Sequence, residues 1–116
     1  MATQIEELSN ALSSLVAKLA PSLVTVRSRR SRSTGFVWRA GLIVTADEAL
    51  ADEGDVQLAL PGGDAVGARI AGRDASTAIA LLRVEAPNLQ PVALATAVPS
   101  AGSLAMVLPL TVRQAR

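Results

Sequence analysis

The sequence predicts a mainly β domain in which one α-helix precedes six or seven short antiparallel strands, closed as a barrel or stacked as a sandwich. Helical spacing of apolar residues is confined to the first twenty residues, and alternating apolar runs follow. Turn-forming residues separate these runs at short intervals, as in all-β domains. A chain of 116 residues suits one domain. We therefore expect residues 1–20 to form the helix and residues 21–116 the β domain.

The helix is predicted by one apolar stripe with alternating spacings of three and four residues. The stripe consists of Ile5, Leu8, Leu12, Leu15 and Leu19. Thr3, followed three residues later by Glu6, predicts a capping box at the start, and Pro21 ends the helix at Ala20. The simplest interpretation is a helix lying on the body of the domain. The alternative is a short self-associating seam, although two heptads are few for one.

The strands are predicted from alternating or continuous apolar runs. The expected strands are residues 23–26, 35–38, 42–45, 56–60, 66–71, 79–84 and 104–108. Residues 86–112 carry no charge and could span a bilayer by length alone. Because Pro91, Pro99, Pro109, Gly102 and several polar residues interrupt this segment, we interpret it as two buried strands joined by a turn. No membrane association is expected.

Composition excludes several functions. The net charge of +1 argues against nucleic acid as a partner, and the basic run at 27–32 is expected to be a solvated hairpin loop, with phosphate or RNA binding as the lesser alternative. Without Cys or His there is no disulfide, thiolate or imidazole chemistry, and no cofactor is expected. The N-terminus lacks the basic start and apolar core of a signal peptide, which predicts a cytoplasmic protein.

Residues 21–108 resemble the first β-barrel of the HtrA/Deg-type, trypsin-like serine proteases. "PSLVTV" at 21–26 is similar to the opening "PSVVxI" of that family, "TGFVW" at 34–38 to "GSGFVI", and "GLIVT" at 41–45 to "GYIVTN". "VQLALPGG" at 56–63 resembles "VxVxLxDG", and "GRDASTAIALLRV" at 72–84 resembles "GxDxxTDLAVLKV". The resemblance implies a six-stranded, Greek-key antiparallel barrel, which is half of a trypsin-like fold.

The resemblance also implies that the catalytic triad is degenerate. The family's general base is the His of "TNxHV", and Glu48 occupies that position here. Its triad Asp lies in "TDLA", where this sequence has Ala78. The family's nucleophile comes from a "GNSGGP" loop of a second barrel, and this sequence contains no such loop. We therefore expect no peptidase activity.

No other chemistry replaces the triad. A glutamate carboxyl is ionised well below neutral pH and is a poor base for a serine hydroxyl, and Ala78 cannot orient Glu48. The single lysine, Lys18, lies on the helix, and the serines at 76, 100 and 103 occupy turns without a glycine-framed elbow. A calcium site in the acidic cluster is the lesser alternative to a solvated turn, and no metal is expected. The cluster comprises Asp47, Glu48, Asp52, Glu53 and Asp55.

Two functions from different classes remain. The first is a non-catalytic binding or scaffolding module that keeps the protease barrel without its chemistry. The second is a component or fragment of a serine endopeptidase whose nucleophile barrel lies on another chain or elsewhere in a longer protein. An apolar barrel flank and the helix stripe both predict a partner, either a further copy of the chain in a homo-oligomer or another protein chain.

Overall fold

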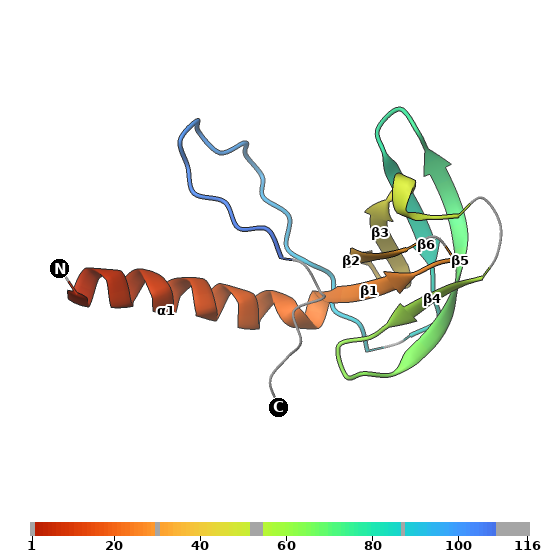
Figure 1. Ribbon diagram of the computed structural model, residues 1–116, viewed down its shortest axis with the longest axis horizontal. Helices are drawn as coiled ribbons and strands as arrows, with labels where there is room; N and C mark the ends of the chain where they lie inside the picture. The colour runs from red at the N-terminus through yellow and green to blue at the C-terminus, as the bar shows by residue number, and fades with distance from the viewer. Residues whose placement is uncertain (1, 30, 52–54, 87, 109–116) are drawn as a thin grey trace.

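The computed structural model describes residues 2–29, 31–51, 55–86 and 88–108 (Figure 1). An α-helix and a 3₁₀ helix come first, and six strands follow, with a second 3₁₀ helix after the third. The elements are α1 (Ala2–Leu19), η1 (Ala20–Ser22), β1 (Leu23–Arg27), β2 (Arg32–Arg39), β3 (Leu42–Ala46), η2 (Asp47–Ala49), β4 (Val56–Ala59), β5 (Ala65–Asp74) and β6 (Ile79–Arg83).

The six strands form a closed antiparallel barrel in the order β1-β2-β3-β6-β5-β4. Closure comes from the pairing of β1 with β4, in which Val26 lies opposite Leu58. Because β4 returns to lie beside β1, the order of the first four strands is 4-1-2-3, which is a Greek key. The predicted six-stranded Greek-key barrel with one N-terminal helix is confirmed.

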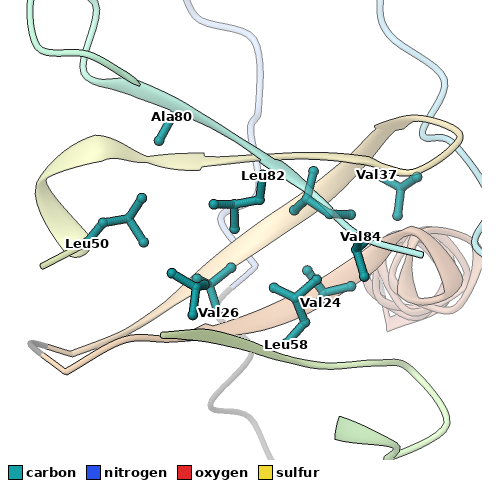
Figure 2. Close-up of a cluster of buried hydrophobic side chains, with 10 residues drawn as sticks. Val24, Val26, Val37, Leu50, Leu58, Ala80, Leu82 and Val84 are labelled. Carbon is teal, nitrogen blue, oxygen red and sulfur yellow. The ribbon is translucent and has the colours of Figure 1, made fainter. Parts of the chain in front are cut away.

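The core of the barrel is almost entirely aliphatic, as the composition predicts. Alternate residues of the strands point inward, and Figure 2 shows side chains from different strands converging on the barrel axis. The buried apolar residues are Val24, Val26, Val37, Ile43, Leu50, Val56, Leu58, Ala80, Leu82 and Val84. Burying a Val, Leu or Ile side chain contributes roughly 1.5–3 kcal/mol, so this cluster is the main source of stability.

One wall of the barrel is also apolar on its outer face. Register pairs align Leu23 with Phe36, Phe36 with Val44, and Val44 with Leu81, which makes a row across β1, β2, β3 and β6. All four side chains are half-buried, while their chain neighbours point into the core. We call these four residues the outer row. On the other wall, the outward positions of β4 and β5 include Gln57, Gly67 and Arg69.

The helix departs from three expectations. It begins at Ala2, so Thr3 lies inside it and cannot cap it, because alanine is the best helix former and continues the helix past Thr3. It also does not lie on the body of the domain: α1 projects away from the barrel, beyond the start of β1 (Figure 1). It ends at Leu19, one residue earlier than predicted, and Pro21 lies in the 3₁₀ turn that follows.

The expectation of buried strands in the uncharged segment is wrong for residues 88–108, which contain no helix or strand. Val98, Leu104 and Val107 are each more than four-fifths exposed. The six strands already close the barrel, so no free edge remains for a seventh at 104–108, and the prolines interrupt pairing. The remainder of the predicted segment, residues 109–112, lies outside the described residues.

Four strands are longer than predicted: β1 and β3 by one residue each, and β2 and β5 by four residues each. β2 begins at Arg32 and β5 extends to Asp74, because Arg27 pairs with Arg32 and Asp74 pairs with Ile79 at the ends of the two ladders.

Within the described residues, no helix is long and apolar enough to cross a membrane.

Gly35 should be irreplaceable for steric reasons. A Cβ atom there would lie 2.8 Å from the Ile43 Cγ2 and 3.0 Å from the Val26 Cγ2, inside the packed core. Gly35→Ala is therefore expected to lower the free energy of unfolding by about 1–3 kcal/mol, measured by urea denaturation with Trp38 fluorescence. Gly67→Ala is the matched control, because its Cβ meets nothing within 4 Å. Equal stability of the two variants would contradict this account of the core.

Candidate functional site

Three loops meet at the end of the barrel that is distant from α1 (Figure 1). They are the β1–β2 loop at 28–31, the segment 47–51 that contains η2, and the β5–β6 turn at 75–78. Ala46 pairs with Ile79 at the end of the β3–β6 ladder, and the Asp47 amide N–H then donates to the Ala78 carbonyl oxygen at 3.0 Å. This contact brings the segments of Glu48 and Ala78, the predicted triad positions, side by side.

Glu48 lies in η2 with its side chain exposed to solvent. Among the described residues, none donates a hydrogen bond to its carboxylate or forms an ion pair with it. The position therefore holds an acid that the described residues neither orient nor bury.

Ala78 has a left-handed backbone conformation, with φ of 63°. Non-glycine residues pay roughly 1–2 kcal/mol for this conformation. Its methyl group is exposed and cannot accept a hydrogen bond, and its carbonyl oxygen is occupied by Asp47. Ala78 contributes main-chain geometry to this end of the barrel, and its side chain supplies no chemistry.

Arg73 on β5 clamps the segment that carries Glu48. Its Nε lies 2.6 Å from the Asp47 Oδ1, and its Nη2 donates to the Asp47 carbonyl oxygen at 3.1 Å. Its Nη1 donates to the Ala51 carbonyl oxygen at 3.1 Å. Both side chains of the ion pair are less than one-third exposed. A single guanidinium thus fixes both ends of this short segment.

Serine hydroxyls hold the same segment from the other side. Ser28 Oγ and Ser31 Oγ donate to the Ala49 carbonyl oxygen at 2.9 Å and 3.2 Å. The basic run predicted as a solvated hairpin loop is therefore only partly so: Arg29 is exposed, but the serines anchor the loop on η2. Arg30 lies outside the described residues.

Three members of the predicted acidic cluster, Asp47, Glu48 and Asp55, lie within the described residues. Within the described residues, no three carboxylates lie close enough together to hold a metal ion. The Asp47 carboxylate is engaged by Arg73, while Asp52 and Glu53 lie outside the described residues. Asp47 and Glu48 lie in the 3₁₀ turn η2.

A pocket of about 380 Å³ opens near the opposite end of the barrel. Its lining includes Pro21, Leu60, Pro61, Val66, Ala86 and Leu89. None of its lining residues belongs to the three loops that hold Glu48 and Ala78, so this pocket is separate from the predicted triad positions.

A closed Greek-key barrel that brings these loops together at one end is the architecture of half a trypsin-like fold. The family profile described as "Trypsin-like peptidase domain" matches residues 33–111. The chain therefore belongs to the trypsin-like peptidase domain family. No curated protein gives a significant match to the chain.

Solved structures agree with this assignment. The serine endoprotease of Yersinia pestis superposes with a TM-score of 0.70 at 27% identity, over 75% of this chain and 34% of its own. An inactive form of the Rv3671c protease, a protein of Mycobacterium tuberculosis, superposes with a TM-score of 0.70 at 27% identity, over 76% of this chain and 44% of its own. This chain thus spans less than half the length of either protease.

The sequence located Glu48 and Ala78 but missed the contacts around them. No residue pattern predicts the ion pair between Arg73 and Asp47, which are 26 positions apart. Nor does any pattern predict that Ser28 and Ser31 both donate to the Ala49 carbonyl oxygen. The predicted stripe residues Ile5, Leu8, Leu12, Leu15 and Leu19 lie on α1, on the far side of the barrel from this site (Figure 1).

Ala78→Gly should stabilise the protein. Glycine adopts a left-handed conformation without the Cβ penalty, and its greater entropy in the unfolded chain offsets part of the gain. We expect an increase of about 0.5–1 kcal/mol in the free energy of unfolding, measured by urea denaturation. Ala65→Gly, in the extended backbone of β5, should instead lower the free energy of unfolding by a similar amount. A lower stability of the Ala78→Gly variant would contradict the left-handed backbone conformation of Ala78.

The stability that the turn before Ala78 gains from the Asp74–Ser76 hydrogen bonds should be lost at acidic pH. The Ser76 hydroxyl and amide both donate to the Asp74 carboxylate, at 2.7 Å and 3.0 Å, and these bonds lower the pKa of Asp74. A lowered folded-state pKa gives stability that is present above the unfolded-state pKa and is lost as pH falls through the folded-state value. Ser76→Ala should raise the pKa of Asp74 in an NMR titration, whereas Ser103→Ala should leave it unchanged.

Proposed function

We propose that this barrel is a non-catalytic homologue of the trypsin-like peptidases and acts as a binding or scaffolding module. The observation that carries the proposal is the pair Glu48 and Ala78, whose segments join through the Asp47–Ala78 hydrogen bond. The resemblance assigns the general base and its orienting acid to these two positions. The barrel holds the segments of positions 48 and 78 side by side, but position 48 has no imidazole and position 78 has no carboxylate.

Among the described residues, no neighbouring side chain is placed to take over the role of the base. The adjacent carboxylate, Asp47, is held in an ion pair by Arg73. Lys18 lies on α1, which projects away from the barrel (Figure 1). A serine hydroxyl needs a base that is within hydrogen-bonding reach and is held in place by an orienting partner. Glu48 has no such partner among the described residues.

A binding role agrees with the apolar surfaces of the chain. Four stripe residues of α1 are between 39% and 65% exposed. Exposed apolar patches of this kind usually mark protein–protein contacts. The partner that we propose is a protein chain, either a second copy or another protein.

The second candidate is a component of a two-barrel serine endopeptidase. Two observations favour it: the chain spans 34% and 44% of the two similar proteases, and the outer row gives one barrel wall an apolar face suited to packing against a partner. The nucleophile would then lie outside residues 1–116, and Glu48 would have to serve as its base.

Absence of peptidase activity is the direct test of the first candidate. The purified chain is expected to neither cleave an unfolded protein substrate nor react specifically with a fluorophosphonate probe. Glu48→His/Ala78→Asp should also be inactive, because none of the serines near this end sits in a glycine-framed elbow with an oxyanion hole. Specific labelling of any serine in either protein would refute the proposal.

The two candidates separate when the protein is captured from its native host. The captured protein, with any chain that accompanies it, is treated with the same fluorophosphonate probe. A labelled serine that disappears in the Glu48→Gln variant would establish the endopeptidase component. Lack of labelling, with an active protease as positive control, would support the non-catalytic module.

A further inference from the structure

Two arginines lie directly opposite each other on the outer face of the barrel. Arg69 of β5 pairs with Arg83 of β6, and both residues are exposed, whereas the neighbouring pair of Ile70 and Leu82 packs in the core. Directly opposite residues of an antiparallel pair have Cβ atoms about 4.5–5.5 Å apart, and like charges at these positions repel. Within the described residues, neither arginine forms an ion pair. Two positive charges therefore face solvent together.

A hollow of about 270 Å³ lies against this arginine pair. It is lined by Arg69, Ile70, Ala71 and Arg83, so both charged residues of the lining are arginines. The register of β5 and β6 shifts between Ile70 and Gly72, which leaves Ala71 as the extra residue of a β-bulge. Ala71 and Gly72 are exposed and small, so their side chains leave space beside the guanidinium groups.

The surroundings of the pair are positively charged. Glu85 shares a neighbouring hollow with both arginines, but it does not line the hollow of 270 Å³. A third arginine lies in the same row across the sheet, because Arg83 pairs with Leu42 of β3 and Leu42 pairs with Arg39 of β2. One carboxylate against three arginines leaves a net positive charge on this part of the outer face.

We propose that the arginine pair and the hollow of 270 Å³ form a binding site for a phosphate monoester. Guanidinium groups bind phosphate through paired N–H···O bonds, and two of them on neighbouring strands can contact one phosphate from two sides. A phosphate monoester carries nearly two negative charges at neutral pH and so neutralises the pair, whereas a carboxylate carries one. The hollow has about nine times the volume of one liquid water molecule, which is room for a phosphate and part of its carrier.

The site is separate from the predicted triad positions. Its residues lie on β5 and β6, and none belongs to the three loops that hold Glu48 and Ala78. The inference adds a ligand to the proposed binding function, and it does not depend on the loss of catalysis.

Inorganic phosphate is the probe that tests the site. In an NMR titration at neutral pH and constant ionic strength, the amide signals of residues 69–72 and 82–84 are expected to shift along a binding curve. Acetate should give no such curve at these residues, because it carries a single charge. Arg69→Gln and Arg83→Gln should each weaken phosphate binding by about fivefold or more, since each removes one guanidinium.

Arg29→Gln is the matched control, because Arg29 is also exposed but lies in the β1–β2 loop. This variant should bind phosphate as the wild type does. The same spectra show whether each variant keeps the folded barrel. An equal response to acetate, phosphate shifts confined to other residues, or unchanged binding by both Arg69→Gln and Arg83→Gln would overturn the proposal.

Thermal unfolding gives an independent test. A ligand that binds the folded protein alone raises its Tm. Phosphate should raise the Tm of the wild type more than acetate at the same ionic strength, and this difference should vanish in Arg69→Gln/Arg83→Gln. Without phosphate, at low ionic strength, Arg83→Gln should itself raise the Tm because it removes the repulsion within the pair. A Tm below that of the wild type would contradict the repulsion on which the site depends.

A short peptide with one phosphoserine distinguishes the two sources of the phosphate group. Tighter binding of this peptide than of inorganic phosphate would support a phosphorylated protein as the carrier, and equal binding would support a small phosphorylated molecule. Equal binding of the same peptide without its phosphate would overturn the site.

These outcomes are distinguishable from failure of the proposed function. Absence of phosphate binding removes this site and leaves the fluorophosphonate result untouched. A labelled serine removes the non-catalytic module and leaves the phosphate site intact.

Discussion

Barrel closure is the constraint on which the rest of the structure depends. Once β1 pairs with β4, every strand has two neighbours, and inward residues of all six contribute to one largely aliphatic core. Closure also leaves no edge on which a further strand could add. The apolar residues of α1 and of 88–108 therefore remain outside the barrel, with Ile5, Val98 and Leu104 among those exposed.

A set of contacts holds the loops at the far end of the barrel together. Arg73 from β5, the hairpin serines and the Asp47–Ala78 bond hold the segment of Glu48 from three directions. In an active peptidase such rigidity would keep a base in register with its substrate. Here it holds an exposed glutamate beside an alanine.

The barrel was predictable because its signals are local and mutually consistent: alternating apolar runs, turn residues and the resemblance all indicated the same strands. The positions of Glu48 and Ala78 followed from counting along those strands. The errors arose where sequence cannot report competition for space. Residues 104–108 look like a strand, but no edge accepts them, and the stripe of α1 looks like a face for the barrel, but α1 extends away from it. The Arg73 clamp was missed because it joins distant residues through main-chain carbonyls.

The hydrogen bond between the Asp47 amide and the Ala78 carbonyl is made entirely by main-chain atoms. Side chains at 48 and 78 can consequently change without breaking the link between their segments. In evolutionary terms, folding and catalysis are separable traits in this architecture: a lineage can exchange the acid–base residues by single substitutions while selection for a stable barrel continues undisturbed. That separability gives a physical route by which enzymes of this fold can give rise to inactive descendants that are still well folded.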